Sequence, residues 1–333
     1  FCAIITKDRI FLLDSEGVLT AYDLSGKKKI WKNRVFDRKY LTKYQNPKIS
    51  YSDGKIFAVA GSNKIAAVNM DDGKIIWSRE IYSIPVSTAI SDGKMVYVTT
   101  NDNKTYAIDV NDGSLKWTHF GIRKNTAILG AADIVIYKKY LISSYSSGEV
   151  YLIDRKTGRE IWSVSLNLNR AVDSDFYLND VDATPVVKSG VIYAIGNGGL
   201  MAAIDARNGD FIWKKQIDSV ADFWVAGNFI YVINNENQLL AVYKENGRIK
   251  WFKQLPKQEN KKYKNIYNSV VMAGDKLVIN SDLGMIFVVD PNDGGILEEK
   301  QLAKRNHHMP AFVNGRFYLH SLGRYKTRLI EVK

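Results

Sequence analysis

The sequence is poor in the groups that support catalysis. Cys2 is the only cysteine among 333 residues, so no disulfide can form within the chain. No run of about 18 apolar residues is present, which excludes a membrane-spanning helix. Only four histidines occur, and there is neither a Gly-rich phosphate-binding loop nor a nucleophile elbow. We therefore expect a protein that is not an enzyme.

Metal sites are equally poorly supported. The pair His307–His308 has no cysteine, histidine or acidic residue near it at ligand spacing, so we interpret it as part of a loop. The acidic run from Asp173 to Asp182 begins like a calcium loop. It carries Tyr177 and Leu178 where such a loop needs an oxygen ligand and a glycine. No metal and no cofactor are expected.

The charge balance is strongly basic, with a formal net charge of +12. Lysine and arginine are spread along the chain, and the densest cluster runs from Lys257 to Lys264. An RNA-binding aromatic motif and a helix with a basic face are both missing. We therefore expect a solvated basic surface and no nucleic-acid partner.

The most informative pattern present is a repeat. Six times a tryptophan follows eight residues after a position that is usually aspartate, and the steps between tryptophans are 46, 40, 45, 51 and 38 residues. A seventh register starts at Asp290 but has Glu298 in place of tryptophan. A period near 40–45 residues is typical of repeat architectures. The six tryptophans are Trp31, Trp77, Trp117, Trp162, Trp213 and Trp251.

The segment from Ala183 to Ile217 shows what one repeat contains. Four short apolar runs are separated by turns that carry Gly or Asn, which predicts a four-stranded antiparallel meander. The second run of each repeat, such as Met95–Thr99, does not alternate polar with apolar residues, so both faces of the sheet must be covered. A two-sheet sandwich leaves one face of each sheet open to solvent, whereas the four-stranded blades of a β-propeller are covered on both faces.

Counting the repeats predicts an all-β, eight-bladed propeller formed as one domain over residues 1–333. The eighth blade starts at Pro310, has three strands and lacks its outer strand. Propellers usually close by letting one end of the chain complete the last blade, so we expect the missing strand to precede Phe1. The first seven blades begin near Cys2, Pro47, Val86, Ala132, Ala183, Ala221 and Ser269.

The spacing also predicts roles for the two repeated residues. The aspartate ends the third strand, where its carboxylate can accept hydrogen bonds from backbone NH groups of the following turn. The tryptophan lies on the outermost strand, where its ring can cover the turn and the adjoining blade. We interpret all six tryptophans as structural docking residues.

The longest step, 51 residues, contains the acidic run and so places an insertion between blades four and five. Polar insertions on a rigid scaffold are where binding residues collect. The alternative is an ordinary solvated loop.

Two motifs resemble known families. The pattern Ala-Xaa-Asp followed by a Gly turn and Trp, as in Ala107–Trp117 and Ala203–Trp213, resembles the repeats of pyrroloquinoline-quinone-type propellers. The more specific stretch Leu178–Val187, with Asp218–Phe223 after it, is similar to the BamB family of lipoproteins of the β-barrel assembly machinery.

The BamB resemblance implies a non-enzymatic scaffold on the periplasmic side of the bacterial outer membrane. Such a protein is a monomer within the barrel assembly complex, binds a POTRA domain of BamA and assists nascent β-barrel proteins. A signal peptide and a lipidated cysteine would precede this chain, because Cys2 falls inside the first strand.

The resemblance also implies partner-binding residues. Asp180 and Asp182, with the adjacent Asn179, match the family's acidic contact segment. The second contact element matches Thr126–Gly130, where Ile128 keeps the apolar character and Leu129 replaces an arginine.

Two alternatives remain open at this point. One is a quinone-dependent dehydrogenase, although a single cysteine cannot supply the vicinal pair typical of that class. The other is an interaction propeller with a different envelope partner.

Overall fold

The computed structural model describes residues 2–26, 28–41, 47–122, 132–167, 181, 183–197, 199–256, 259–260, 263–264, 266–302, 311–313, 316–322 and 327–332. Within these ranges nearly all regular structure is β, and the one helical element is the 3₁₀ turn η1 (Arg38–Tyr40). None of the described helical structure is long and apolar enough to cross a membrane.

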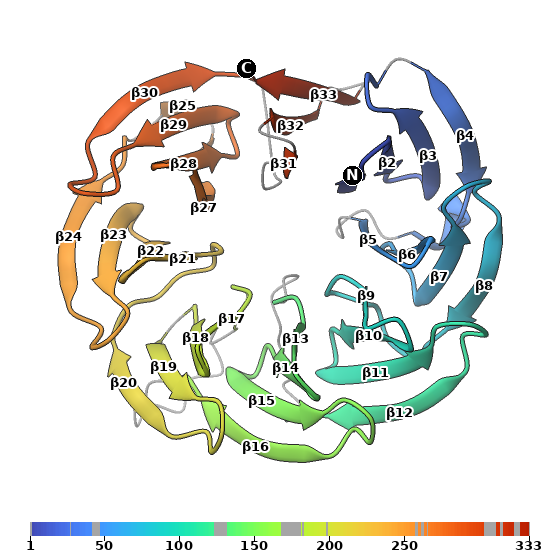
Figure 1. Cartoon of the computed structure of the whole chain (residues 1–333), viewed down its shortest axis with the longest axis horizontal. Helices are drawn as coiled ribbons and strands as arrows, with labels where there is room; N and C mark the ends of the chain where they lie inside the picture. The colour runs from blue at the N-terminus through green and yellow to red at the C-terminus, as the bar shows by residue number, and fades with distance from the viewer. Residues whose placement is uncertain are drawn as a thin grey trace. The chain divides into compact units, whose positions relative to one another are not determined.

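The chain divides into two compact units. The first contains four antiparallel sheets, each built from four strands in chain order (Figure 1). The strands are β1 (Cys2–Ile5), β2 (Arg9–Leu13), β3 (Val18–Asp23) and β4 (Lys29–Arg34); β5 (Lys48–Ser52), β6 (Lys55–Val59), β7 (Lys64–Asn69) and β8 (Ile75–Glu80); β9 (Ile90–Ser91), β10 (Met95–Thr100), β11 (Lys104–Asp109) and β12 (Leu115–Phe120); β13 (Val135–Tyr137), β14 (Tyr140–Ser144), β15 (Glu149–Asp154) and β16 (Glu160–Ser165).

The second unit contains three more four-stranded sheets, a short hairpin and a three-stranded sheet. Its strands are β17 (Val186–Lys188), β18 (Val191–Ile195), β19 (Met201–Asp205) and β20 (Phe211–Lys215); β21 (Trp224–Ala226), β22 (Phe229–Ile233), β23 (Gln238–Tyr243) and β24 (Ile249–Gln254); the hairpin β25 (Glu259–Asn260) and β26 (Tyr263–Lys264); β27 (Tyr267–Ala273), β28 (Lys276–Ser281), β29 (Met285–Val289) and β30 (Ile296–Gln301); β31 (Ala311–Val313), β32 (Arg316–Leu322) and β33 (Thr327–Val332).

These sheets confirm the predicted meanders. The four strands expected between Ala183 and Ile217 are β17 to β20, and the last sheet has three strands, as the repeat count predicts. The hairpin β25–β26 was not foreseen, because its residues belong to the lysine-rich stretch that carries no strand periodicity.

Apolar cores lie between successive sheets within each unit. Phe11 on β2 packs in one cluster with Ile56 on β6, and Phe57, also on β6, packs in the next cluster with Val98 on β10. Neighbouring residues of β6 therefore bury their side chains on opposite faces, against different sheets. This explains why the second strands are apolar without alternation.

A β-bulge recurs between the third and fourth strands of all seven four-stranded sheets. In the third sheet Ala107 pairs with Trp117, but Ile108 pairs with Leu115, so Lys116 is the extra residue. The bulge adds one residue to the path from turn to tryptophan. It is thus part of the fixed spacing of eight, and the sequence alone did not reveal it.

Candidate functional site

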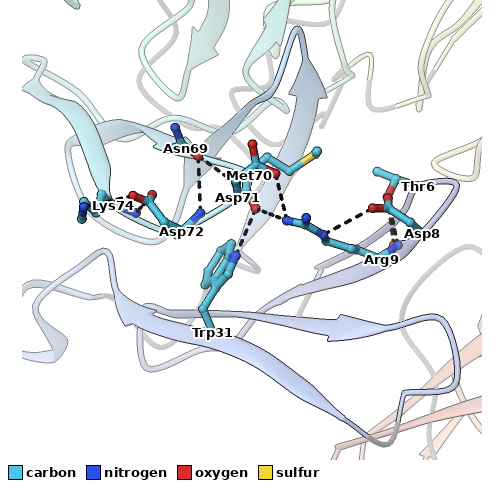
Figure 2. A network of polar contacts seen from close by, with 9 residues as sticks. All are labelled: Thr6, Asp8, Arg9, Trp31, Asn69, Met70, Asp71, Asp72 and Lys74. Carbon is cyan, nitrogen blue, oxygen red and sulfur yellow. Dashed lines mark hydrogen bonds and ion pairs between the residues drawn. The ribbon is translucent and has the colours of Figure 1, made fainter.

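Within each unit, tryptophans join one sheet to the sheet that follows it. The indole Nε1 of Trp31 on β4 donates to the backbone carbonyl of Met70, 3.0 Å away, in the turn after β7 (Figure 2). Arg9 donates to the same carbonyl at 3.0 Å, and its guanidinium lies 3.1 Å from the Asp71 carboxylate. Two side chains of the first sheet thereby hold one turn of the second.

The same indole–carbonyl hydrogen bond recurs within both units. In each case the acceptor directly follows the residue at the aspartate position of the next sheet. The other pairs are Trp77 with Val110 (3.0 Å), Trp117 with Arg155 (3.1 Å), Trp213 with Lys244 (2.9 Å) and Trp251 with Pro291 (3.2 Å). Trp162 occupies the matching position on β16 and is half-buried.

Glycine is needed in these turns because the ring lies so close. Gly113 has a φ of 72°, and a Cβ placed there would lie 2.9 Å from the ring of Trp77. A side chain would therefore meet both an unfavourable backbone and the indole.

The aspartates hold the same turns from within. Asp109 Oδ1 accepts the backbone NH of Asn111 at 2.9 Å, and this bond, with the Lys116 ammonium, lowers the pKa of the Asp109 carboxyl. The Arg207 guanidinium and the backbone NH of Arg207 lower the pKa of Asp205 to about 2. The repeated residues thus serve turn geometry and packing between sheets.

The opposite end of the sheets is organised differently. In a four-stranded meander, the turn between strands two and three lies at the same end as the passage from strand four to the next sheet. The residues predicted to bind a partner all lie in such passages. The candidate site therefore belongs to the end of the sheets that carries the passages, which we call the passage end.

A buried asparagine organises the passage end of the third sheet. Asn103 sits between β10 and β11 with a φ of 57°. Its Nδ2 donates to the carbonyl of Ile122 at 2.7 Å, and its Oδ1 accepts the backbone NH of Ser146 at 3.1 Å. The backbone NH of Gly121 donates to the Asn103 carbonyl at 2.8 Å. One side chain therefore fixes the start of the passage after β12 and the turn after β14.

Around the passage end of the third sheet, three large apolar side chains are exposed: Tyr82 (94%), Phe120 (66%) and Ile122 (57%). We call them the apolar patch. Between them, Lys104 forms an ion pair of 2.5 Å with Asp102, and its Nζ lies 5.7 Å from the centroid of the Phe120 ring. Although burial opposes it, the hydrogen bonds of Asp102 with Lys104, Thr100 and Ser83 lower the pKa of its carboxyl.

The residues predicted to bind a partner lie outside the described ranges. These are Asn179, Asp180, Asp182, Ile128 and Leu129. The first unit does contain residues on their borders: the backbone NH of Ala132 donates to the carbonyl of Val181 at 3.4 Å, and both residues are buried. This hydrogen bond joins Val181, between Asp180 and Asp182, to Ala132, which lies two residues after the second contact element.

In the second unit the chain after Asp182 is also held. Ala183 is buried, and the backbone NH of Thr184 donates to Asp222 Oδ1 at 2.8 Å. Asp222 belongs to Asp218–Phe223, the stretch that the sequence places after the acidic segment.

Sequence reasoning missed Asn103 and the apolar patch. The signal was weak: Phe120 and Ile122 sit a few residues before the stretch that matches the second contact element, and an asparagine in a tight turn is a common residue at positive φ.

The described residues contain no group of three or more His, Cys, Asp or Glu that could hold a metal ion. His307 and His308 lie outside the described ranges. His119 is buried on β12, with Nδ1 2.9 Å from the Tyr145 hydroxyl and Nε2 3.8 Å from the Glu160 carboxylate. Burial lowers its pKa, so His119 packs as a neutral ring between the third and fourth sheets.

Known proteins resemble this chain in sequence. Residues 15–253 match the family described as outer membrane protein assembly factor BamB. The assembly factor BamB of Yersinia pestis is 26% identical over 223 residues, which cover 64% of this chain but only 56% of that protein. The BamB of Moranella endobia is 25% identical over 309 residues, covering 90% of this chain and 77% of that protein.

The fold is shared as well. The crystal structure of BamB from Moraxella catarrhalis superposes with a TM-score of 0.82 at 19% identity, covering 96% of this chain and 92% of that one. The predicted β-propeller of four-stranded blades is therefore confirmed. Because the family match extends over well more than half of the sequence, the chain belongs to the family of outer membrane protein assembly factor BamB.

Proposed function

We propose that this chain is a non-enzymatic scaffold in the assembly of outer-membrane β-barrel proteins, and that it binds a POTRA domain of BamA. The observation that carries the proposal is the family match over residues 15–253, together with relatives named as assembly factors. The protein would act on the periplasmic side of the outer membrane, held by a lipid anchor outside this chain.

We assign the contact to the two segments at the passage end. Asp180 and Asp182, with Asn179, supply acceptors for basic or NH groups of the partner, and Ile128 and Leu129 supply apolar contact. The bond between Ala132 and Val181 supports this assignment, because it joins two segments that lie about fifty residues apart in the sequence. A single partner domain can contact both segments only if the points where they join the sheets lie close together.

Charge reversal tests the assignment. Asp180→Arg and Asp182→Arg should each weaken binding to the purified POTRA region of BamA by roughly tenfold or more, because a paired carboxylate becomes a repelling cation. The thermal midpoint should hardly move. Isothermal titration calorimetry and a thermal melt measure the two effects.

Asp275→Arg is the matched control. This carboxylate is well exposed, lies in the turn between β27 and β28 at the other end of its sheet, and undergoes the same change of charge. Equal affinities for the wild type, Asp180→Arg and Asp182→Arg would refute the assigned contact. Failure of the wild-type chain to bind at all would refute the proposed function.

A further inference from the structure

The apolar patch gathers three exposed side chains around the passage end of one sheet. The exposed fractions are 94% for the tyrosine, 66% for the phenylalanine and 57% for the isoleucine. Apolar area left in water gives the folded chain no stabilisation from burial. Exposed aromatic side chains that gather at one place mark a protein contact more often than a free surface. The patch therefore needs a partner.

A chain of interactions leads from the residue after Tyr82 to the ring of Phe120. Ser83, next to Tyr82, is hydrogen-bonded to Asp102, and Asp102 pairs with Lys104. The ammonium of Lys104 in turn lies over the ring of Phe120. The backbone NH of Asn101 donates to the Ile84 carbonyl at 3.0 Å, which holds the passage after β8 against the end of β10.

The charge of the patch is cancelled locally. Lys104 and Asp102 are exposed by only 17% and 22%, and each neutralises the other. Among the described residues of the patch, a partner therefore meets aromatic and aliphatic side chains and one neutralised ion pair. Such a surface fits an apolar ridge on a protein better than an anionic lipid surface, which is held by free cations.

The backbone at one edge of the patch is held in place. Asn103 fixes the carbonyl of Ile122, and Gly121 packs against the ring of Tyr145, leaving no room for a Cβ. A backbone that is already held in place loses little conformational entropy when a partner covers it. The patch therefore has the features of an interface hot spot.

We propose that the apolar patch docks against the same partner domain as the acidic segment. In the sequence, Ile122 is followed directly by residues 123–131, which contain Ile128 and Leu129. The next residue, Ala132, donates its backbone NH to the carbonyl of Val181. The partner domain would place an apolar ridge on the patch and basic or NH groups on the carboxylates. This inference rests on the proposed function and extends its contact to a third element.

Titration calorimetry of full-length variants with the purified POTRA region of BamA tests the inference. The double variant Phe120→Ala/Ile122→Ala and the single variant Tyr82→Ala should each bind roughly tenfold more weakly. Phe252→Ala is the matched control, since Phe252 is 59% exposed on the outer strand β24. It should bind as the wild type does, and thermal melts should agree for all variants.

The outcomes separate this inference from the proposed function. Wild-type affinity in the patch variants, with weakened binding in Asp180→Arg, would overturn the patch and leave the proposed function standing. No binding by the wild-type chain would overturn both. The patch variants are also tested for binding to phosphatidylethanolamine/phosphatidylglycerol vesicles and for self-association. If either property is lost while POTRA affinity is unchanged, the patch serves lipid or a second copy of the chain, and its assignment to the partner domain is overturned.

Discussion

The two ends of a blade solve different problems. At the docking end, around the turns that receive the tryptophans, the same indole contact and turn glycine recur from sheet to sheet. Figure 2 shows one of these contacts, that of Trp31. At the passage end, the connections differ in length and chemistry. The buried Asn103 lies in the turn between β10 and β11, and the exposed Phe120 and Ile122 lie where β12 leads into the following passage.

The difference teaches where to look for function in a repeat protein. A feature that every repeat needs serves the contact between repeats. A feature that occurs once, and that leaves apolar side chains in water, serves something outside the chain. Three substitutions, ordered by expected effect, test this division.

The largest effect is expected at the docking end. Trp77→Ala should lower the free energy of unfolding by about 3–5 kcal/mol, because it removes a large buried ring and leaves a cavity against Gly113. Trp224→Ala is the control, since Trp224 is 38% exposed and lies outside the repeated register. Urea denaturation measures both. If Trp77→Ala and Trp224→Ala lower the free energy of unfolding equally, the repeat register does not identify the tryptophans that stabilise the fold.

An intermediate effect is expected at the passage end. Asn103→Gly keeps the positive φ but removes the bonds to Ile122 and Ser146, so the free energy of unfolding should fall by about 2 kcal/mol. POTRA affinity should fall with it, because Ile122 loses its support. Asn237→Gly, at the matching turn of the sixth sheet with a φ of 60°, should leave POTRA affinity unchanged. If Asn103→Gly lowers the free energy of unfolding but leaves POTRA affinity unchanged, Asn103 has a structural role and no role in binding.

The smallest effect concerns the turn carboxylates. The pKa of Asp205 is about 2 in the folded chain, below its ordinary 3.8. Its stabilising effect is therefore present above pH 4 and is lost as the pH falls toward 2. Asp205→Asn should flatten the fall of the thermal midpoint over this interval, since Asn69 already accepts the same kind of backbone bond in the second sheet. An unchanged slope would contradict the role given to the carboxylate.

Much of the docking end could be predicted from the sequence. The spacing of Asp109 and Trp117 repeats, so periodicity alone indicates four strands, a turn and a covering ring. The bulge at Lys116 could not be predicted, because its position depends on pairing across two strands. Nor could the acceptor of each indole, which lies 31 to 40 residues further along the chain.

The passage end was harder to predict for a physical reason. Asn103 acts through Ile122, Ser146 and Gly121, and contacts between such distant positions follow from the assembled sheets. The exposure of Phe120 likewise depends on what the neighbouring sheet leaves uncovered. The acidic segment was identified only through family resemblance, since it interrupts the repeat and has no periodicity of its own.

The direction of the tryptophan contacts has a consequence for the order in which the protein acquires its structure. Five indoles reach forward in the chain to a carbonyl that is synthesised later: those of Trp31, Trp77, Trp117, Trp213 and Trp251. A chain that is synthesised N-terminus first cannot form such a contact when the last strand of the blade appears. Each of these five contacts must wait for about one more repeat, so the docking of these blades lags one blade behind synthesis.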